Sequence, residues 1–376
     1  MNVLIAGDFC PQYRVAELFE KGDFAAVLGE VKPSIEQADY SIVNFECPIT
    51  KGGESPIEKC GPNLQCSESG MDAVKWAGFN CVTLANNHFL DYGEAGVANT
   101  LDACQKYGID VVGGGRNLQE AARILYKEIN GQTLAVINCC EHEFSIATKT
   151  TAGSNPLNPI QQYYAIQEAK LNADYVLVIV HGGHEHYQLP SPRMQETYRF
   201  FIDAGADAVV NHHQHCFSGY EVYQGKPIFY GIGNFCFDGN RSKKALWHEG
   251  YMVLFTIEGN SVAYDCIPYL QCRENASVQF LSSSQKKIFD ESIEKINGII
   301  CDDTALVNEI NDFYQSSSLH YDSLFEPFGG RWFRFLKKKG LLPSFMSRKK
   351  IVKAEDFICC ESHRDKLFYY LLNKLN

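Results

Sequence analysis

Five short apolar runs constrain the fold of this 376-residue chain more than any other feature of its sequence. Each run is rich in Val, Ile and Phe, and helical patterns separate the runs. Runs this apolar are typical of strands buried on both faces, so they predict a layered α/β fold. The runs are 2–7 (NVLIAG), 40–45 (YSIVNF), 81–85 (CVTLA), 175–180 (YVLVIV) and 207–211 (DAVVN).

Helix and hairpin signals lie around these runs. The segment 67–79 begins with a capping serine and ends at Gly78, 93–109 ends at Gly108, and 191–206 begins with Ser-Pro and ends at Gly205. Asn130-Gly131 divides 124–138 into two strand-like runs, which is the signature of a type I′ hairpin. A second hairpin is expected over 251–270, with its turn at 258–261. The sequence therefore predicts sheets with both parallel and antiparallel strands.

After about residue 280 the sequence pattern becomes mainly helical. We expect one α/β domain over 1–272 and a mainly helical extension over 273–376. Within the extension, 331–353 holds nine Lys or Arg residues and no acid, interleaved with Trp332, Phe333, Phe335 and Phe345. Such a segment can attach peripherally to an anionic membrane surface, on the inner face here. The favoured interpretation is a helix whose aromatic side chains pack on the main domain.

Composition excludes several classes of protein. The net charge of −11 argues against nucleic acid as the main partner, because phosphate backbones attract basic surfaces. No apolar run is long enough to span a bilayer, and the N-terminus lacks the basic region and cleavage site of a signal peptide. The 15 cysteines include no CxxC pair, so reduced thiols in the cytoplasm are expected. The oligomeric state is left open by the sequence.

Polar residues follow the five apolar runs at the point where each run ends. Because the carboxyl ends of strands in α/β sheets border a common crevice, these side chains are expected to share one region. The residues are Asp8, Glu46, Asn86, Asn87, His88, His181, His212, His213 and His215.

The residue types at these ends indicate a metal site. Six of the 11 histidines fall between 181 and 215, and carboxylates with imidazoles suit Zn, Mn or Fe. Any one of these residues alone is better explained as a helix cap, an Asx turn or a packed histidine. Five coincident strand ends favour the metal site, with His184, His186 and His212 as its weakest members. A site with two metals would need a bridging carboxylate.

Long motifs in this sequence resemble the CapA-type family of capsule and poly-gamma-glutamate synthesis (PGA_cap), which is related to calcineurin-like metallophosphoesterases. The resemblance covers roughly 2–270 in matching order. It implies a four-layer α/β/β/α sandwich of mixed sheets with a centre for two divalent transition metals. The motifs are AGDFCP, NFECPIT, LANNHFLDYGEAGVANTLDAC, GGGRNLQEA, HGGHEHYQLPSPRMQ and AGADAVVNHHQHCFSGYEVYQGKPIFYGIGNFCFD.

The resemblance implies a role for each matching residue. Asp8, Asn87, His181, His213 and His215 are similar to metal ligands of the phosphoesterases, and Glu46 takes the place of their bridging aspartate. His88 is similar to the catalytic histidine of the GNH motif, and Asp91 is placed to orient it through a hydrogen bond. Glu185 matches the glutamate of the His-x-Gly-x-Glu segment, and His212 lies beside the His-x-His pair.

Two residues depart from the expected patterns, and the first of them bears on the second metal. Cys10 stands where the first strand usually carries a histidine, so that metal position either loses a nitrogen ligand or gains a thiolate. Asn211 stands where the family tends to have glycine, and it either narrows the pocket or changes a turn.

Three functions fit these residues. The first is a metal-dependent hydrolase, phosphoesterase-like, associated with capsule or cell-surface polymer synthesis and acting on a small or polymeric anion. The second is a non-hydrolytic assembly factor that binds an anionic polymer. The third is an amide hydrolase that acts on a glutamyl polymer or peptide. Fold alone does not choose among them.

Overall fold

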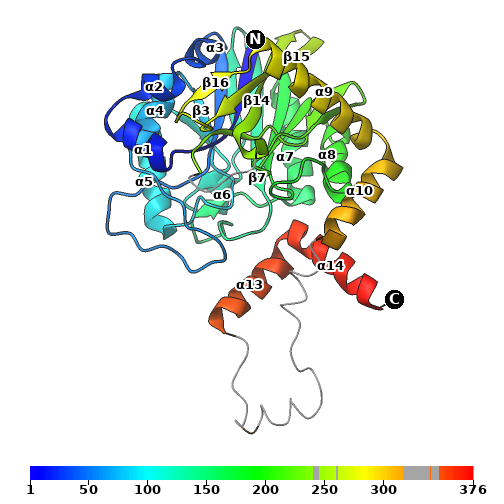
Figure 1. Cartoon of the computed structure of the whole chain (residues 1–376). Helices are drawn as coiled ribbons and strands as arrows, with labels where there is room; N and C mark the ends of the chain where they lie inside the picture. The colour runs from blue at the N-terminus through cyan, green and yellow to red at the C-terminus, as the bar shows by residue number, and fades with distance from the viewer. Residues whose placement is uncertain (240–244, 260, 317–338, 340–346, 376) are drawn as a thin grey trace.

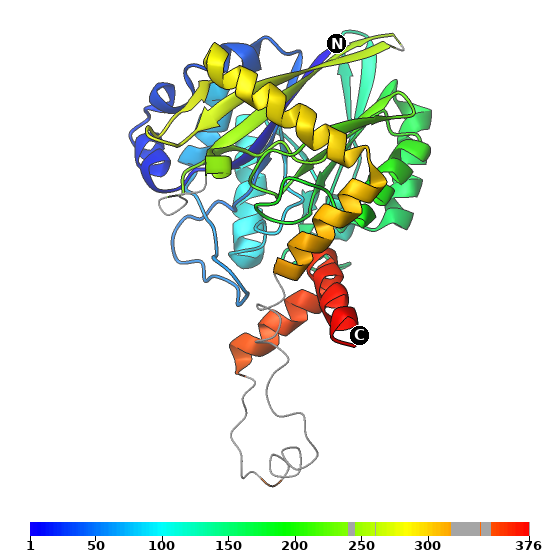
Figure 2. The ribbon, with the colours of Figure 1, turned by 45° about the vertical axis from the view of Figure 1, so that its right-hand side comes forward.

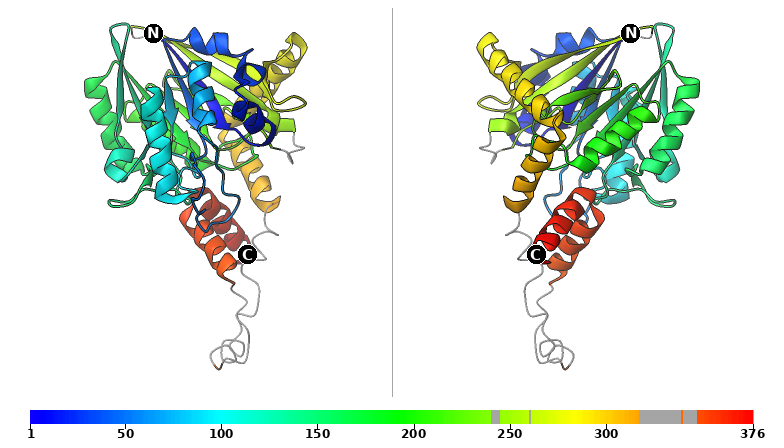
Figure 3. Two further views of the ribbon diagram at one scale, coloured as in Figure 1. Left: turned by 90° about the vertical axis from the view of Figure 1, so that its left-hand side faces the viewer. Right: turned by 90° about the vertical axis from the view of Figure 1, so that its right-hand side faces the viewer.

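Two large β-sheets pack face to face in the computed structural model, which describes residues 1–239, 245–259, 261–316, 339 and 347–375. Helices cover the outer face of each sheet (Figure 1, and from both sides in Figure 3). This arrangement confirms the predicted four-layer α/β/β/α sandwich of mixed sheets.

The first sheet holds the N-terminal strands. Its strands β1 to β4 are parallel, β14 to β16 run antiparallel, and β13 pairs with the end of β1. Its order is β16 (Val278–Phe280), β15 (Ser261–Gln271), β14 (Glu249–Glu258), β1 (Asn2–Cys10), β2 (Tyr40–Phe45), β3 (Cys81–Thr83) and β4 (Asp110–Val112), with β13 (Asn234–Phe237) beside β1. A Cβ at Gly7 would lie 1.9 Å from the Gly233 carbonyl oxygen, so only glycine lets the chain before β13 approach β1.

The second sheet holds the strands from the middle of the chain. Its central strands are parallel and both edge strands are antiparallel. The order is β11 (Tyr220–Tyr223), β12 (Lys226–Phe229), β10 (Ala208–His212), β9 (Tyr175–His181), β7 (Gln132–Cys140) and β6 (Leu125–Ile129). The predicted hairpin turn is confirmed, because Asn130 and Gly131 both have positive φ, at 51° and 79°. A small sheet pairs β5 (Gly114–Gly115) with β8 (Gly153–Ser154).

Side-chain alternation along β1 explains the layering. Val3 and Ile5 join the core between the sheets, whereas Leu4 and Ala6 join the core under the first helical layer. That layer holds α1 (Tyr13–Glu20), α2 (Phe24–Leu28), α3 (Lys32–Glu36), α4 (Ser69–Ala77) and α5 (Gly93–Tyr107). The other layer holds α7 (Pro159–Asn172) and α8 (Pro192–Asp203), and a short α6 (Leu118–Ala121) lies beside β5.

The helix boundaries follow the predicted caps with one exception. Ser191 caps α8 by accepting from the Met194 amide, and Gly78 and Gly108 end α4 and α5 in the left-handed conformation. The exception is the start of α4. The helix begins at Ser69 with Glu68 at its N-cap position, and the Ser67 hydroxyl donates to Glu20 and accepts from the Ser69 amide at 3.3 Å.

The last part of the described chain is mainly helical. A capping box at Ser282 starts α9 (Ser283–Ile300), whose buried residues close one edge of the core between the sheets (Figure 2). It is followed by α10 (Asp303–Ser316), α13 (Arg348–Cys359) and α14 (Glu361–Leu375). Because β16 still belongs to the first sheet, the domain boundary at residue 272 stays a prediction. Most of the basic segment, 331–338 and 340–346, lies outside the described residues.

The helices α13 and α14 pack as a pair against the lower end of the sandwich (Figure 1). Arg193 forms an ion pair with Asp365 at 2.8 Å, and the Ser362 hydroxyl donates a hydrogen bond to Glu141 at 2.6 Å. Through these contacts the C-terminal helices meet the loop that follows β7 and the first turn of α8. Among the described helices, none combines the length and apolar character that crossing a membrane requires.

Candidate metal centre

The polar residues that follow the five strands come together in one buried region. Asp8 lies in β1, Glu46 follows β2, Asn87 follows β3, His181 ends β9, and His213 and His215 follow β10. All six are less than a tenth exposed. The sequence prediction that these strand ends share one crevice agrees with this arrangement.

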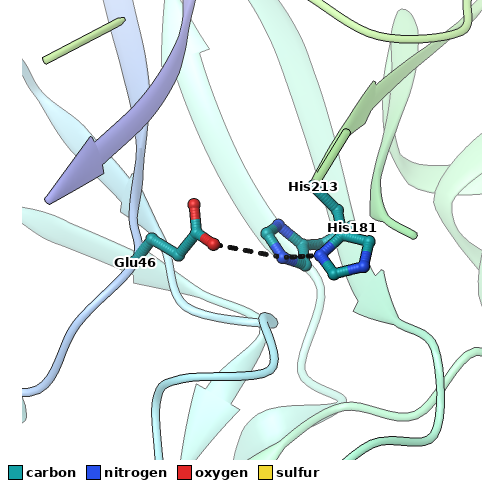
Figure 4. A group of neighbouring side chains, drawn as sticks. All are labelled: Glu46, His181 and His213. Carbon is teal, nitrogen blue, oxygen red and sulfur yellow. Dashed lines mark hydrogen bonds and ion pairs between the residues drawn. The ribbon is translucent and has the colours of Figure 1, made fainter. Parts of the chain in front are cut away.

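Glu46 stands between two groups of possible ligands. Its Oε1 lies 3.7 Å from His181 Nε2 and 3.5 Å from His215 Nε2. One group is Glu46 with His181 and His213, whose side chains point toward one another (Figure 4). The other is Asp8 with Glu46 and His215. A carboxylate shared by two groups is the arrangement that a bridging ligand requires.

Several donor atoms converge on His181. Its Nε2 lies 3.1 Å from His213 Nδ1 and 3.1 Å from Asn87 Oδ1. Asn87 therefore adds an amide oxygen to the first group, as the resemblance implied.

The donor set fits a cation at Glu46. Neither carboxylate oxygen receives a hydrogen bond from any described residue, although the side chain is fully buried. Burial, and next the charge of Asp8, raise the pKa of Glu46 well above its usual value. A buried carboxylate without partners is costly, and a divalent cation bound to it would offset that cost. The orphaned oxygens thus fit a metal.

Asp8 is surrounded by histidines. His212 Nδ1 lies 3.3 Å from Oδ1, and His215 Nδ1 lies 3.4 Å from Oδ2. Burial alone would raise the pKa of Asp8, but these two histidines hold that pKa well below its usual value. Asp8 is therefore ionised at neutral pH.

The turn after β10 carries its histidines in an uncommon backbone conformation. His213 has φ of 90° and His215 has φ of 53°, in the left-handed region that non-glycine residues rarely adopt. Such backbone strain is concentrated at functional sites, where the surrounding structure holds it in place.

His88 and Asp91 form a pair at the edge of the centre. His88 Nδ1 lies 2.6 Å from Asp91 Oδ2, as the predicted orienting bond requires. Lys59 forms an ion pair with Asp91 and lies 3.1 Å from His88 Nδ1. Burial, and next the charge of Lys59, lower the pKa of His88 to about 4.

The remaining predicted residues lie around the centre. Glu185 is half exposed but forms a third possible group with His213 and His215. His212 has no hydrogen bond to either ring nitrogen from the described residues. His184 packs against α10, where its Nε2 lies 3.1 Å from the Tyr314 hydroxyl. The His186 ring lies tilted beside the rings of His215 and Trp247.

Cys10 and Asn211, the two departures, lie outside the possible ligand groups found among the described residues. The register of β1 shifts between Asp8 and Phe9, and Cys10 lies in the core on the helix side, with Cys47. Asn211 accepts from the Tyr198 hydroxyl and donates to the carbonyls of Gly182 and Tyr230. Its side chain therefore joins β10 to its neighbours.

Sequence reasoning missed several supporting residues. Asn44 donates to Asp8 Oδ1 at 2.8 Å, and Asn234 Oδ1 lies 2.9 Å from His215 Nδ1. Both are polar residues inside apolar strands, which is the signal that could have found them. Asn86 donates to the Phe45 carbonyl and accepts from the His88 amide, so it shapes the turn. For Lys59 the sequence offers no signal.

Comparison with known proteins identifies the family. The sequence pattern of the bacterial capsule synthesis protein PGA_cap matches residues 2–239. The chain belongs to the PGA_cap family. Relatives of this PGA_cap protein include the capsule biosynthesis protein CapA of Bacillus anthracis, 35% identical over 277 residues, covering 71% of this chain and 67% of that one. The PGA biosynthesis protein CapA of Bacillus subtilis (strain 168) is 34% identical over 241 residues, which cover 63% of each chain.

The 5'-nucleotidase precursor from Thermus thermophilus is a solved structure similar to this PGA_cap protein. Its TM-score is 0.45 at 11% identity, with 80% of this chain and 59% of that one covered. The family match ends before the C-terminal helices, and the chain spans about two thirds of the length of its Bacillus relatives.

Proposed function

We propose that this PGA_cap protein is a metal-dependent hydrolase of phosphoesters that acts in the synthesis of capsule or another cell-surface polymer. The observation that carries the proposal is Glu46, a buried carboxylate that receives no hydrogen bond from the described residues and faces His181 on one side and His215 on the other. The names of the two Bacillus relatives support the polymer context.

Two cation positions share Glu46 in this proposal. Asp8 and His215 complete one position, and Asn87, His181 and His213 complete the other. Divalent Mn, Zn or Fe held there would lower the pKa of bound water and neutralise charge on a phosphoryl oxygen. Cys10 has no part in either position.

His88 moves the proton. Because a carboxylate only accepts hydrogen bonds, Nδ1–H donates to Asp91 in this proposal, and Nε2 is the ring nitrogen left for the ligand. With a pKa near 4 the imidazole is neutral before substrate arrives. An anionic substrate beside it favours the protonated form, and Nε2 then donates to the leaving oxygen.

The test is metal analysis and hydrolysis assays on protein purified without a metal-affinity tag. We expect bound transition metal, and hydrolysis of p-nitrophenyl phosphate or bis-p-nitrophenyl phosphate that Mn, Zn or Fe enhances. Cleavage of a γ-glutamyl anilide instead would support the amide hydrolase. Absence of both metal and hydrolysis would overturn the proposal.

Two variants separate the proposed roles. His88→Ala should abolish turnover and leave the metal content nearly intact, whereas His213→Ala should lose metal. If the His88 variant keeps its turnover, the proton role assigned to that residue is wrong. Bound metal with no hydrolysis of any probe would favour the non-hydrolytic factor.

A further inference from the structure

A pocket of about 370 Å³ adjoins the candidate metal centre, and the C-terminal helices form part of its wall. Asn87, His88 and His213 line it from the centre. The loop 59–62 adds a second side. From the C-terminal helices, the pocket receives Lys353, Asp356, Phe357, His363 and Lys366. The chain's last described helices therefore contact the same space as the predicted metal ligands.

Two of these residues are cations that form no ion pair within hydrogen-bonding distance of a described carboxylate. Lys353 and Lys366 are half-buried, and neither ammonium forms a salt bridge with a carboxylate in the described part of the chain. Each is placed by an aromatic ring: Lys366 Nζ lies 4.5 Å from the centroid of Phe313, and Lys353 Nζ lies 5.4 Å from that of Phe357. Burial lowers the pKa of Lys366 to about 8, so its charge is poorly solvated.

The carboxylates that line the pocket lie closer to other residues than to the two lysines, although Asp356 Oδ1 receives no hydrogen bond from the described residues. Asp356 Oδ2 lies 3.1 Å from His363 Nδ1, and the Cys360 thiol donates to Glu143 at 3.8 Å. Glu185 forms a possible ligand group with His213 and His215. Lys353 and Lys366 are thus the lysines of the described pocket wall that form no ion pair.

Lysines on a helix are most often solvated, and others on these two helices fit that description. Lys350 in α13 and Lys374 in α14 are exposed and do not line this pocket. Lys353 and Lys366 differ because both are half-buried and reach the space beside the centre. A cation that is partly desolvated and unpaired is stabilised when an anion binds to it.

We propose that Lys353 and Lys366 form a second anion-binding position in this pocket. The ligand then carries two anionic groups, one at the metal centre and a phosphate or carboxylate group at the lysines. The inference depends on the proposed function in one respect, which is that the metal centre binds the first anionic group of the ligand. It assigns the choice of ligand to the C-terminal helices.

The experiment compares three non-hydrolysable probes by calorimetric titration of the full chain loaded with Mn. Propylphosphonate has one anionic group, 3-phosphonopropionate adds a carboxylate, and propane-1,3-diphosphonate adds a second phosphonate. A probe with two anionic groups should bind roughly tenfold or more tightly than propylphosphonate, because its second group can accept charge-assisted hydrogen bonds from the lysines. Of the two probes with two anionic groups, the one that binds more tightly shows whether the lysines prefer a carboxylate or a phosphonate.

Variants on the same helices supply the controls. The double variant K353M/K366M should lose the preference for probes with two anionic groups, while its affinity for propylphosphonate stays unchanged. K353R/K366R keeps both charges and should keep the preference, as should K350M/K374M.

A wild-type protein without the preference, or K353M/K366M that retains it, would overturn the inference. Because the probes are not hydrolysed, the preference can stand even if no hydrolytic activity is found. The failure of one proposal is therefore distinguishable from the failure of the other.

Discussion

His88 Nδ1 lies 2.6 Å from Asp91 Oδ2, and both side chains are buried at the edge of the candidate metal centre. Asp91 is itself fixed, because its Oδ2 accepts from the Leu64 amide at 2.7 Å and Lys59 forms an ion pair with it. The loop before α4 therefore determines how His88 presents Nε2 to the pocket.

Asp91→Asn should reduce turnover by about 10- to 100-fold, the usual loss when a partner of a site residue is removed. The amide no longer fixes the histidine tautomer, whereas no predicted metal ligand is changed. Steady-state kinetics with parallel metal analysis would check this. Asp110→Asn is the matched control, since Asp110 pairs with Lys127 away from the centre and should keep normal turnover. Unchanged kinetics in the Asp91 variant would refute the orienting role.

Glu46→Gln should raise the melting temperature of metal-free protein and abolish its response to added Mn. The amide replaces a buried carboxyl whose raised pKa disfavours the folded metal-free protein at neutral pH, and it also removes the shared ligand. The wild type should instead gain stability with Mn concentration, because a ligand that binds only the folded state stabilises it. Thermal unfolding with and without Mn measures both effects. A Glu46→Gln protein that still responds to Mn like the wild type would contradict the bridging assignment.

Asn211→Ala should lower the free energy of unfolding by about 3 kcal/mol, since it leaves the Tyr198 hydroxyl and two buried carbonyls unpaired. Denaturant unfolding of metal-free protein would measure this loss. Asn172→Ala is the control, because its side chain makes only an exposed bond to Glu168 and should cost much less. Equal losses in the two variants would show that Asn211 has no structural role.

The docking of α14 should weaken as pH rises. The hydrogen bond with Glu361 raises the pKa of His142, with 2.5 Å between Nδ1 and Oε1. A histidine whose folded pKa is raised contributes its full stabilisation below its unfolded pKa of about 6.5 and loses it as pH rises through the folded value. Burial alone would raise the pKa of Glu361, but the hydrogen bond with His142 holds this pKa below its usual value. The stabilisation that Glu361 contributes is therefore lost only at acidic pH.

Amide hydrogen exchange of α14, corrected for the intrinsic effect of pH, should therefore show protection that falls as the pH rises above about 6.5. His142→Gln removes the titrating group and should flatten this dependence. The same slope in both proteins would exclude the pair as its cause.

Sequence patterns were sufficient to predict a layered α/β fold and the meeting of its strand ends, whereas the four-layer arrangement followed from the family resemblance. Apolar runs such as 175–180 reveal buried strands locally, and the polar residue after each run marks the same edge of a sheet. For this reason Asp8, Glu46 and His213 could be placed together before any coordinates.

Other features depend on contacts that no local pattern encodes. Regular strand alternation would place Asp8 and Cys10 on the same face of the sheet. The register shift after Asp8 separates them, and Cys10 packs in the core on the helix side. Lys59 meets Asp91, and Lys366 meets the pocket, only through the packing of segments distant in sequence.

The proposed metal ligands and the two pocket lysines lie in separate parts of the chain, and this separation has an evolutionary consequence. Every proposed metal ligand lies between Asp8 and His215, within the part matched by the family, whereas Lys353 and Lys366 lie beyond it. Descendants of one ancestor can therefore keep the same reactive centre and diverge in ligand preference by exchanging only their terminal helices.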